Sequence, residues 1–262
     1  MIKIKDIYDY INSIAPFENA EDWDNVGLLI GNMEYDVSKI LVALDLNRAV
    51  LEQAINEGVN LIICHHSVIF KPLAKIQLGG MLSTLIANDI SVICAHTNLD
   101  VAKYGVNFCL GETLNLKNTK SLKSGLGTFF GMVGELDREL EQSEFLEEIS
   151  NNLGIDIIRY YFPTGKKIKT VACCSGSGTF MLQDAVAAKA DVLVTGDVKH
   201  SAWYEAEANR IGLVDAGHFN TENVVIPELV RQIKSEFKEV NCKEATHNVA
   251  LYNFWGKRNC GL

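Results

Sequence analysis

Short apolar runs that end in polar side chains alternate with helix-like segments along the first half of the chain. Helical spacing of apolar residues is found at 5–15 and 48–60. Continuous apolar runs occupy 39–46, 61–66 and 90–100. Strands that are covered on both faces of a parallel sheet have this unbroken apolar character. The alternation therefore predicts an α/β fold with a parallel sheet.

The second half of the chain repeats the same order of elements. KILVALDL in the first half matches KTVACCSG, and LIICHH matches VLVTGD. HTNLD (His96 to Asp100) matches HFNTE (His218 to Glu222), so that each histidine is followed four residues later by a carboxylate. A period of this length is too long for a solenoid and indicates duplication of one α/β unit. Chance similarity between strand–helix units is the alternative.

We therefore expect two related, intertwined α/β domains with mixed sheets flanked by helices. The first domain is predicted at 1–125 and the second at 126–244. In the tail, a helix is predicted at 226–240 and a strand at 249–255. That strand is expected to return to the first sheet, so that residues 245–262 join the first domain and intertwine the two.

Composition narrows the class of protein. Nearly half of the 262 residues are hydrophobic, which is enough for a full core, and only four are proline. The net charge of −9 disfavours a general nucleic-acid or anionic-membrane surface, although a local cationic site is still able to hold phosphate. No signal peptide and no apolar run of about 20 residues are evident. The seven cysteines form no CxxC pair, which favours a reduced, cytoplasmic protein.

Histidines gather where the predicted strands end. Five of the six follow a strand-like run directly, and His65 and His66 are adjacent. Zn²⁺, Mn²⁺ and Fe²⁺ all bind imidazole and carboxylate ligands. Neighbouring side chains of a strand point to opposite faces, so both histidines bind metal only where the strand turns, or they serve different metals. The pattern favours two metals, roughly 3.5–4 Å apart, over one.

Each candidate has a structural alternative. The histidine pair is also able to form hydrogen bonds at a strand end, and His96 is either a ligand or the partner of one. Asp100 is alternatively a helix cap or turn residue. His200 lies in the core, on the surface or against a substrate. The SGSG segment at 175–178 suits an anion cradle at a helix start or a simple tight turn.

Several motifs together resemble the NGG-one-interacting-factor-three-like family. They are DWDNVGLLIG, LVALDL, ICHHSVIFKPL, AHTNLD, TGDVKHSAW and DAGHFNTE, and they span Glu21 to Glu222. Bacterial members are commonly called GTP cyclohydrolase 1 type 2 homologues. The resemblance implies a dinuclear metal protein with two related α/β domains, usually a toroidal homohexamer. It also implies the compact form of the family, without an extra domain between the halves.

The resemblance also implies which residues bind the two metals. Matched position by position, the ligands are His65, His66, Asp100, His218 and Glu222. Residues expected beside the metals or against a substrate are His96, His200 and Asn25. The TGD-x-x-H motif ends at His200, at the expected rim of the site. Many members have a second histidine after it where this chain has Ser201, which weakens a substrate role for His200.

Two classes of function follow from these observations. The first is a metal-dependent hydrolase that acts on a small molecule such as a nucleotide or related compound, with metal-activated water as the nucleophile. The alternative is a non-enzymatic protein that handles metal or serves as an interaction scaffold. The ligand set suits Zn, Mn, Fe, Co and Ni, and does not distinguish among them. No general nucleic-acid or membrane partner is expected.

Overall fold

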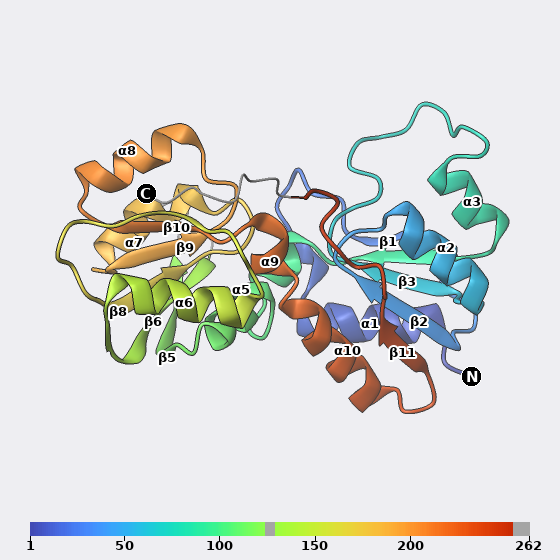
Figure 1. The fold of residues 1–262 in the computed structure, drawn as a ribbon. Coiled ribbons are helices and arrows are strands. Elements are labelled where there is room, and N and C mark those ends of the chain that lie inside the picture. Colours follow the sequence, from blue (N-terminus) through green and yellow to red (C-terminus); the bar gives the residue numbers. More distant parts are fainter. Residues whose placement is uncertain (124–128, 254–262) are drawn as a thin grey trace.

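Two mixed β-sheets, each covered by helices, make up the protein (Figure 1). The computed structural model describes residues 1–123 and 129–253. The two sheets lie side by side, and short helices fill the region between them (Figure 1). The predicted class, an α/β protein with mixed sheets flanked by helices, is confirmed.

The first sheet has five strands in the order β1-β4-β3-β2-β11. All of its neighbouring pairs are parallel except β1 with β4. Its strands are β1 (Gly27–Ile30), β2 (Lys39–Ala43), β3 (Leu61–Cys64), β4 (Ser91–Cys94) and β11 (Asn241–Glu244). The helices around it are α1 (Ile4–Ile14), η1 (Phe17–Asn19), α2 (Arg48–Glu57), α3 (Met81–Ala87), α4 (Thr97–Asp100) and α10 (Val225–Glu236).

The second sheet has six strands in the order β5-β6-β8-β9-β10-β7. Its strands are β5 (Lys117–Lys123), β6 (Phe129–Leu140), β7 (Arg159–Tyr161), β8 (Ile168–Cys173), β9 (Val192–Thr195) and β10 (Gly212–Asp215). The helices around it are α5 (Val106–Thr113), α6 (Gln142–Leu153), η2 (Thr179–Met181), α7 (Leu182–Ala187), α8 (His200–Ala208) and α9 (His218–Glu222).

The two sheets share one topology. In the first, β2, β3 and β4 are parallel neighbours and β1 pairs antiparallel with β4. In the second, β8, β9 and β10 are parallel neighbours and β7 pairs antiparallel with β10. Each third parallel strand is followed by a short helix, α4 or α9. This is the repeat that the matched motifs of the sequence indicate.

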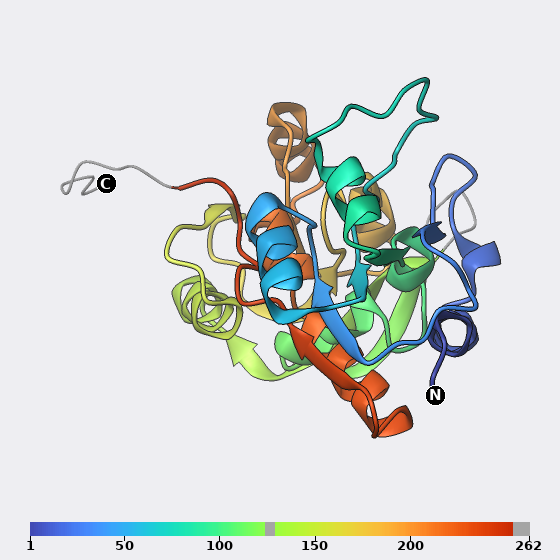
Figure 2. The same cartoon turned by 90° about the vertical axis from the view of Figure 1, so that its right-hand side faces the viewer.

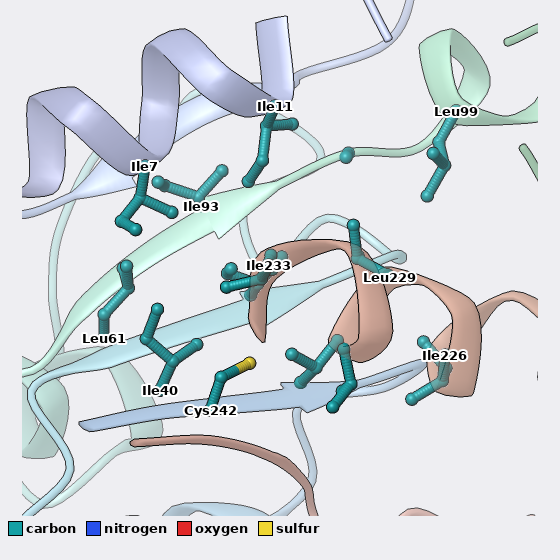
Figure 3. Close-up of a cluster of buried hydrophobic side chains, with 14 of the residues drawn as sticks. Ile7, Ile11, Ile40, Leu61, Ile93, Leu99, Ile226, Leu229, Ile233 and Cys242 are labelled. Carbon is teal, nitrogen blue, oxygen red and sulfur yellow. The ribbon is translucent and has the colours of Figure 1, made fainter. Parts of the chain in front are cut away.

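Alternating side chains of the first sheet pack into two apolar layers, one on each face. Ile40 and Val42 of β2 pack with α1 and α10, whereas Leu41 and Ala43 pack with α2 and α3 on the opposite face. Figure 3 shows the first layer, where Ile7 of α1 and residues of α10 lie over the strands. Full burial of one such isoleucine stabilises the fold by about 1.5–3 kcal/mol. The second sheet is covered in the same way, by α5 and α6 on one face and by α7 and α8 on the other.

The tail differs from the prediction. The helix ends at Glu236, earlier than residue 240, and the returning strand is β11. Residues 249–253 form no strand, and 254–262 lie outside the described residues. β11 pairs in parallel with β2 and buries Cys242 in the first core, so the chain does return from the second sheet to the first. The division at residues 125 and 244 stays a prediction, and residue 125 lies outside the described residues.

Two further features of the fold concern its surface. The loop between β3 and α3 extends away from the first sheet in both views (Figures 1 and 2). Among the described helices, none has the length and apolar character needed to cross a membrane.

Candidate metal centre

Five side chains converge where the carboxyl ends of the two parallel strand sets meet. His65 and His66 follow β3 directly, and Asp100 is the last residue of α4. His218 and Glu222 are the first and last residues of α9, so one helical turn places both on the same side. The fold therefore brings the five predicted ligands together, and their binding of metal stays a prediction.

Glu222 lies at the centre of this cluster. Its Oε2 is 3.0 Å from the Nε2 of His66 and 3.0 Å from the Nε2 of His218. Its Oε1 is 3.9 Å from the Nε2 of His65, which in turn is 3.6 Å from Oδ1 of Asp100. One carboxylate of the second half thus faces imidazoles of both halves.

The side chains of the two adjacent histidines both face the site because the chain leaves the strand just before them. β3 stops at Cys64, and the backbone N–H groups of His65 and His66 both donate to the carbonyl of Leu44. This bend cancels the alternation that would send the two rings to opposite faces. Their ring centroids are 5.0 Å apart.

Every histidine of the cluster is held through Nδ1. A carbonyl or carboxylate only accepts, so each Nδ1 carries a proton, which leaves Nε2 as the ring nitrogen that faces the cluster and is able to bind a metal. Metal-binding histidines are typically oriented in this way. The Nδ1 contacts are His65 to Ala95 O (2.9 Å), His66 to Asp45 Oδ1 (2.8 Å), His96 to Asp24 Oδ1 (2.9 Å) and His218 to Asp197 Oδ2 (2.7 Å).

Three buried polar atoms of the cluster have no hydrogen-bond partner. They are His65 Nε2, Asp100 Oδ1 and Glu222 Oε2. Glu222 Oε2 lies 3.0 Å from the Nε2 atoms of His66 and His218, and it accepts a hydrogen bond there only while those rings carry a second proton, which a bound metal would replace. Each unsatisfied group costs about 1–3 kcal/mol, and a cation coordinated by all of them removes that cost.

The donor atoms form three overlapping groups, each with its atoms within 4.8 Å of one another. Imidazole nitrogen and carboxylate oxygen are the ligands of divalent transition metals, so this set fits such ions. The groups are His65, His66 and His96; His66, His218 and Glu222; and His65, Asp100 and Glu222.

Burial and neighbouring charge shift the imidazole pKa values in opposite directions. Burial lowers the pKa of His65 to about 3, so this ring is neutral and ready to bind. Burial also opposes the charge on His66, but the carboxylates of Asp45 and Glu222 outweigh it and raise its pKa to about 10. The hydrogen-bonding carboxylate of Glu222 raises the pKa of His218 to about 9.

The carboxyl groups of the cluster diverge as well. Burial, together with the nearby charge of Glu222, raises the pKa of Asp100 well above its usual value. Burial acts against ionisation of Glu222 too, yet His218 and His66 lower the pKa of that carboxyl. A divalent cation beside Asp100 would favour its ionised form and offset this effect of burial.

Glycines of the second half make room for the cluster. Gly176 has φ +59°, and a Cβ there would lie 2.2 Å from Oε1 of Glu222. A Cβ on Gly196 would lie 2.6 Å from the backbone nitrogen of His218. Any larger side chain at either position therefore pushes a predicted ligand aside.

A cavity of about 610 Å³ opens directly above the cluster. Its walls contain the polar side chains of the site together with four aromatic rings. The lining residues are Glu21, Trp23, His66, Phe70, His96, Thr97, Asp100, Asn107, Phe130, Cys174, Ser175, Ser177, Phe180, His218 and Glu222.

The remaining predicted residues lie in different places. His96 belongs to the cluster and lines the cavity. Asn25 is not in the lining, and its Nδ2 donates to the carbonyl of Ile69 at 2.5 Å. His200 begins α8, is exposed and contacts the ring of Tyr204, so the fold does not bring it to the cluster.

The SGSG segment is a tight turn rather than an anion cradle. Backbone N–H groups at 175, 176 and 178 donate to Asn107, Thr221 and Thr195, so none of the three is free for a ligand. The six described cysteines are free and buried.

Sequence reasoning missed the three carboxylates that orient the imidazoles. Asp24, Asp45 and Asp197 each follow or precede a strand-like run, and this position was the feature of the sequence that could have identified them. Asp24 is the most strongly fixed. Burial raises its pKa, but hydrogen bonds from His96 and Thr97 dominate and lower it to about 2.

Two related mixed sheets, with a buried histidine–carboxylate cluster where they meet, define an α/β protein with a candidate divalent-metal site. The family model of Duf34/NIF3 (NGG1p interacting factor 3) matches residues 2–250, and the chain belongs to this family. The family resemblance of the sequence motifs is thereby confirmed.

Two named relatives match most of the chain in sequence. The chain is 34% identical to a Clostridium acetobutylicum protein named GTP cyclohydrolase 1 type 2 homolog, over 84% of this chain and 85% of the relative. A Clostridium perfringens protein of the same name is 33% identical over 93% and 97%.

Solved structures give the same fold. A hypothetical protein of Staphylococcus aureus has a TM-score of 0.88 and 30% identity, and covers 97% of this chain and 99% of its own. Reduced HcgD from Methanocaldococcus jannaschii has a TM-score of 0.79 and 30% identity, over 94% and 98%.

Proposed function

We propose that the chain binds two divalent metal ions between its sheets and uses them to hydrolyse a nucleotide or related small molecule. The observation that carries the proposal is the set of buried donor atoms without partners, on His65, Asp100 and Glu222. A folded protein leaves such atoms unsatisfied when a ligand completes them. The Nδ1 contacts aim the imidazole lone pairs at the same point, which supports the proposal further.

The overlapping groups suggest how the two ions are shared. His66, His218 and Glu222 would hold one, and His65, Asp100 and Glu222 would hold the other. Glu222 belongs to both groups and faces one with each oxygen, which is the role of a bridging carboxylate in two-metal sites. His96 groups with His65 and His66 and lines the cavity, so it lies beside the metals on the substrate's side.

When bound, the metals would supply a water activated near neutral pH and positive charge for the transition state. The chain's own residues would prepare that chemistry. Asp45 and Asp197 fix the tautomers of His66 and His218 and increase the basicity of these rings. Glu222 is buried and the side chain of Asp100 is only 13% exposed, and the cavity that both line would admit a small molecule.

The nucleotide as substrate class is supported by the names of the relatives. The two clostridial proteins are named as homologues of a GTP cyclohydrolase, an activity on a purine nucleotide. The homohexamer implied by the family resemblance stays a prediction, which analytical ultracentrifugation of the purified full chain tests.

Reconstitution is the test of the proposed function. The metal-free chain would be loaded in turn with Zn, Mn, Fe, Co or Ni, and its metal content measured by elemental analysis. Each form would then be incubated with GTP, other nucleotides and phosphoesters. We expect about two metals per chain and turnover that depends on them. A chain that binds both metals and turns over none of these compounds would favour the metal-handling role instead.

A further inference from the structure

Aromatic side chains from both halves of the molecule line the cavity above the candidate metal centre. Trp23 and Phe70 come from two loops of the first half and are stacked, with ring centroids 6.0 Å apart and planes 17° apart. Phe130 of β6 and Phe180 of η2 come from the second half and meet edge to face at 5.7 Å. The same cavity thus has an aromatic pair from each half and predicted metal ligands in its wall.

The first pair is exposed although its backbone is firmly held. Trp23 is 58% exposed and Phe70 is 48% exposed, which for large apolar rings is a cost unless something covers them. Both rings also contact the ring of His96 edge to face, at 6.0 and 5.9 Å. The aromatic pair therefore stands against the cluster itself and does not point into solvent elsewhere.

Hydrogen bonds next to Trp23 fix this platform in advance. The carboxylate of Asp24 accepts bonds from His96, Thr97 and the backbone N–H of Asn25. The side chain of Asn25 donates to the carbonyl of Ile69, which ties the Trp23 loop to the Phe70 loop. A surface that is ordered before binding loses little entropy when a ligand stacks on it.

The charge of the lining indicates which part of a ligand enters. Among the described residues of the wall there is no lysine or arginine, whereas Glu21, Asp100 and Glu222 are acidic. Phosphate recognition by side chains normally uses lysine or arginine. The aromatic part of the cavity therefore suits a flat, uncharged ring and not a phosphate chain.

We propose that the cavity binds the flat heteroaromatic ring of the substrate, of purine size, by stacking on Trp23 and Phe70. Phe180 and Phe130 form the opposing wall, and the ring lies above the metal centre. This inference rests on the proposed function, because it assigns the part of the substrate that the cavity selects. Asn25 is a positioning residue, since it acts by joining the two loops that carry the platform.

The experiment compares a ring without phosphate with a phosphate without a ring. The metal-loaded full chain would be titrated calorimetrically with guanosine and, separately, with ribose 5-phosphate. We expect guanosine to bind the more tightly of the two. Stacking on one aromatic side chain contributes about 1–3 kcal/mol, so Trp23→Leu should weaken guanosine binding about 5- to 150-fold. Trp23→Phe, which keeps an aromatic face, should restore most of the affinity.

Matched variants separate this effect from general damage. Tyr204→Leu removes an aromatic ring that is 60% exposed on α8, outside the cavity, and should leave guanosine affinity unchanged. Phe180→Leu tests the opposing wall independently and should also weaken binding. All variants should keep the metal content of the unaltered chain, because none of these rings belongs to the ligand groups.

Two results would overturn the inference. One is ribose 5-phosphate binding as tightly as guanosine, and the other is unchanged guanosine affinity in both Trp23→Leu and Phe180→Leu. If the exposed platform is instead covered by a second copy of the chain, Trp23→Leu alters sedimentation and leaves guanosine affinity unchanged. The proposed function fails separately, through absence of turnover in a chain that binds metals and guanosine.

Discussion

The two halves of this protein have one topology but contribute different chemistry to the site between them. In the first half, His65 and His66 directly follow the parallel strand β3. The matching strand β9 of the second half ends in Gly196 and Asp197, which supply space for His218 and a hydrogen bond to its ring. The shared topology places the strand ends, and the residues at those ends have different roles in the two halves.

A second pair of matched positions shows the same division. Leu46 of the first half corresponds to Gly176 of the second in the aligned motifs. Leu46 packs in the apolar layer under α2, whereas Gly176 lies against Glu222 and tolerates no side chain. The first half therefore has a core residue where the second half has space for the site, and only the two halves together give the full set of candidate ligands.

The sharpest test of this comparison removes the carboxylate that serves both halves. Glu222→Gln should abolish binding of both metals, because this residue belongs to two of the ligand groups. Asp100→Asn, in the first half only, should lower the metal content by about one per chain. Elemental analysis after dialysis measures both. Glu147→Gln, an exposed residue of α6, is the control, and full metal content in Glu222→Gln would contradict the assignment.

The space made by the second half is tested next. Gly176→Ala and Gly154→Ala both place a side chain on left-handed backbone, at φ +59° and +64°, which costs about 1–2 kcal/mol. Only Gly176 has an obstructing neighbour, so its variant should lose about 1–3 kcal/mol more through overpacking and should also lose metal. Urea unfolding of the metal-free chains measures the difference. Equal stability of the two variants would show that the close approach to Glu222 is unimportant.

The orienting carboxylates allow a balanced comparison of the halves. Asp45→Ala frees the ring of His66, and Asp197→Ala frees the ring of His218. Each should weaken metal binding about 10- to 100-fold, because a ligating imidazole needs a fixed tautomer and direction. Competition with a chelator of known affinity measures this, and Asp9→Ala on the outer side of α1 serves as control. A loss in one variant alone would mean that only one half positions its metal.

The smallest expected effect is the release of protons when metal binds. In the metal-free chain the pKa of His66 is raised to about 10 and that of His218 to about 9, so both rings are protonated at pH 7. Metal must displace those protons, so that binding releases about two from these two rings near pH 7, besides any from Asp100, and tightens as pH rises towards 10. Calorimetry in buffers of different ionisation enthalpy counts them. Affinity independent of pH between 6 and 9 would contradict the two shifts.

The sequence predicted those parts of the fold whose signal is local. Unbroken apolar runs located β2, β3, β4 and β9, whereas the matched His-x-x-x-acid segments, which were expected at the ends of strands, form the short helices α4 and α9. β11 was missed because Asn241–Glu244 contains one apolar residue, Cys242, and its strand character comes from pairing with β2. The 249–253 segment has apolar residues suited to a strand but no partner strand.

The site shows the same limit. Its histidines and carboxylates were candidates because they lie at strand ends, where polar residues are conspicuous among apolar ones, and the family resemblance named five of them as ligands. The bond between Asp24 and His96 joins residues far apart in the chain and depends on how the loops pack. The stacking of Trp23 on Phe70 also depends on how the loops pack, and no spacing along the chain predicts it.

The late return of the chain to the first sheet has a consequence for biosynthesis. β11 completes the edge of the first sheet beside β2 only after the whole second sheet has been made. Until then β2 is an open edge on a growing polypeptide, which is a template for wrong pairing. His218 and Glu222 also emerge late, so a nascent chain holds His65 and His66 without their counterparts. If the cluster binds two metals as proposed, the complete site therefore forms only after the second half has been synthesised.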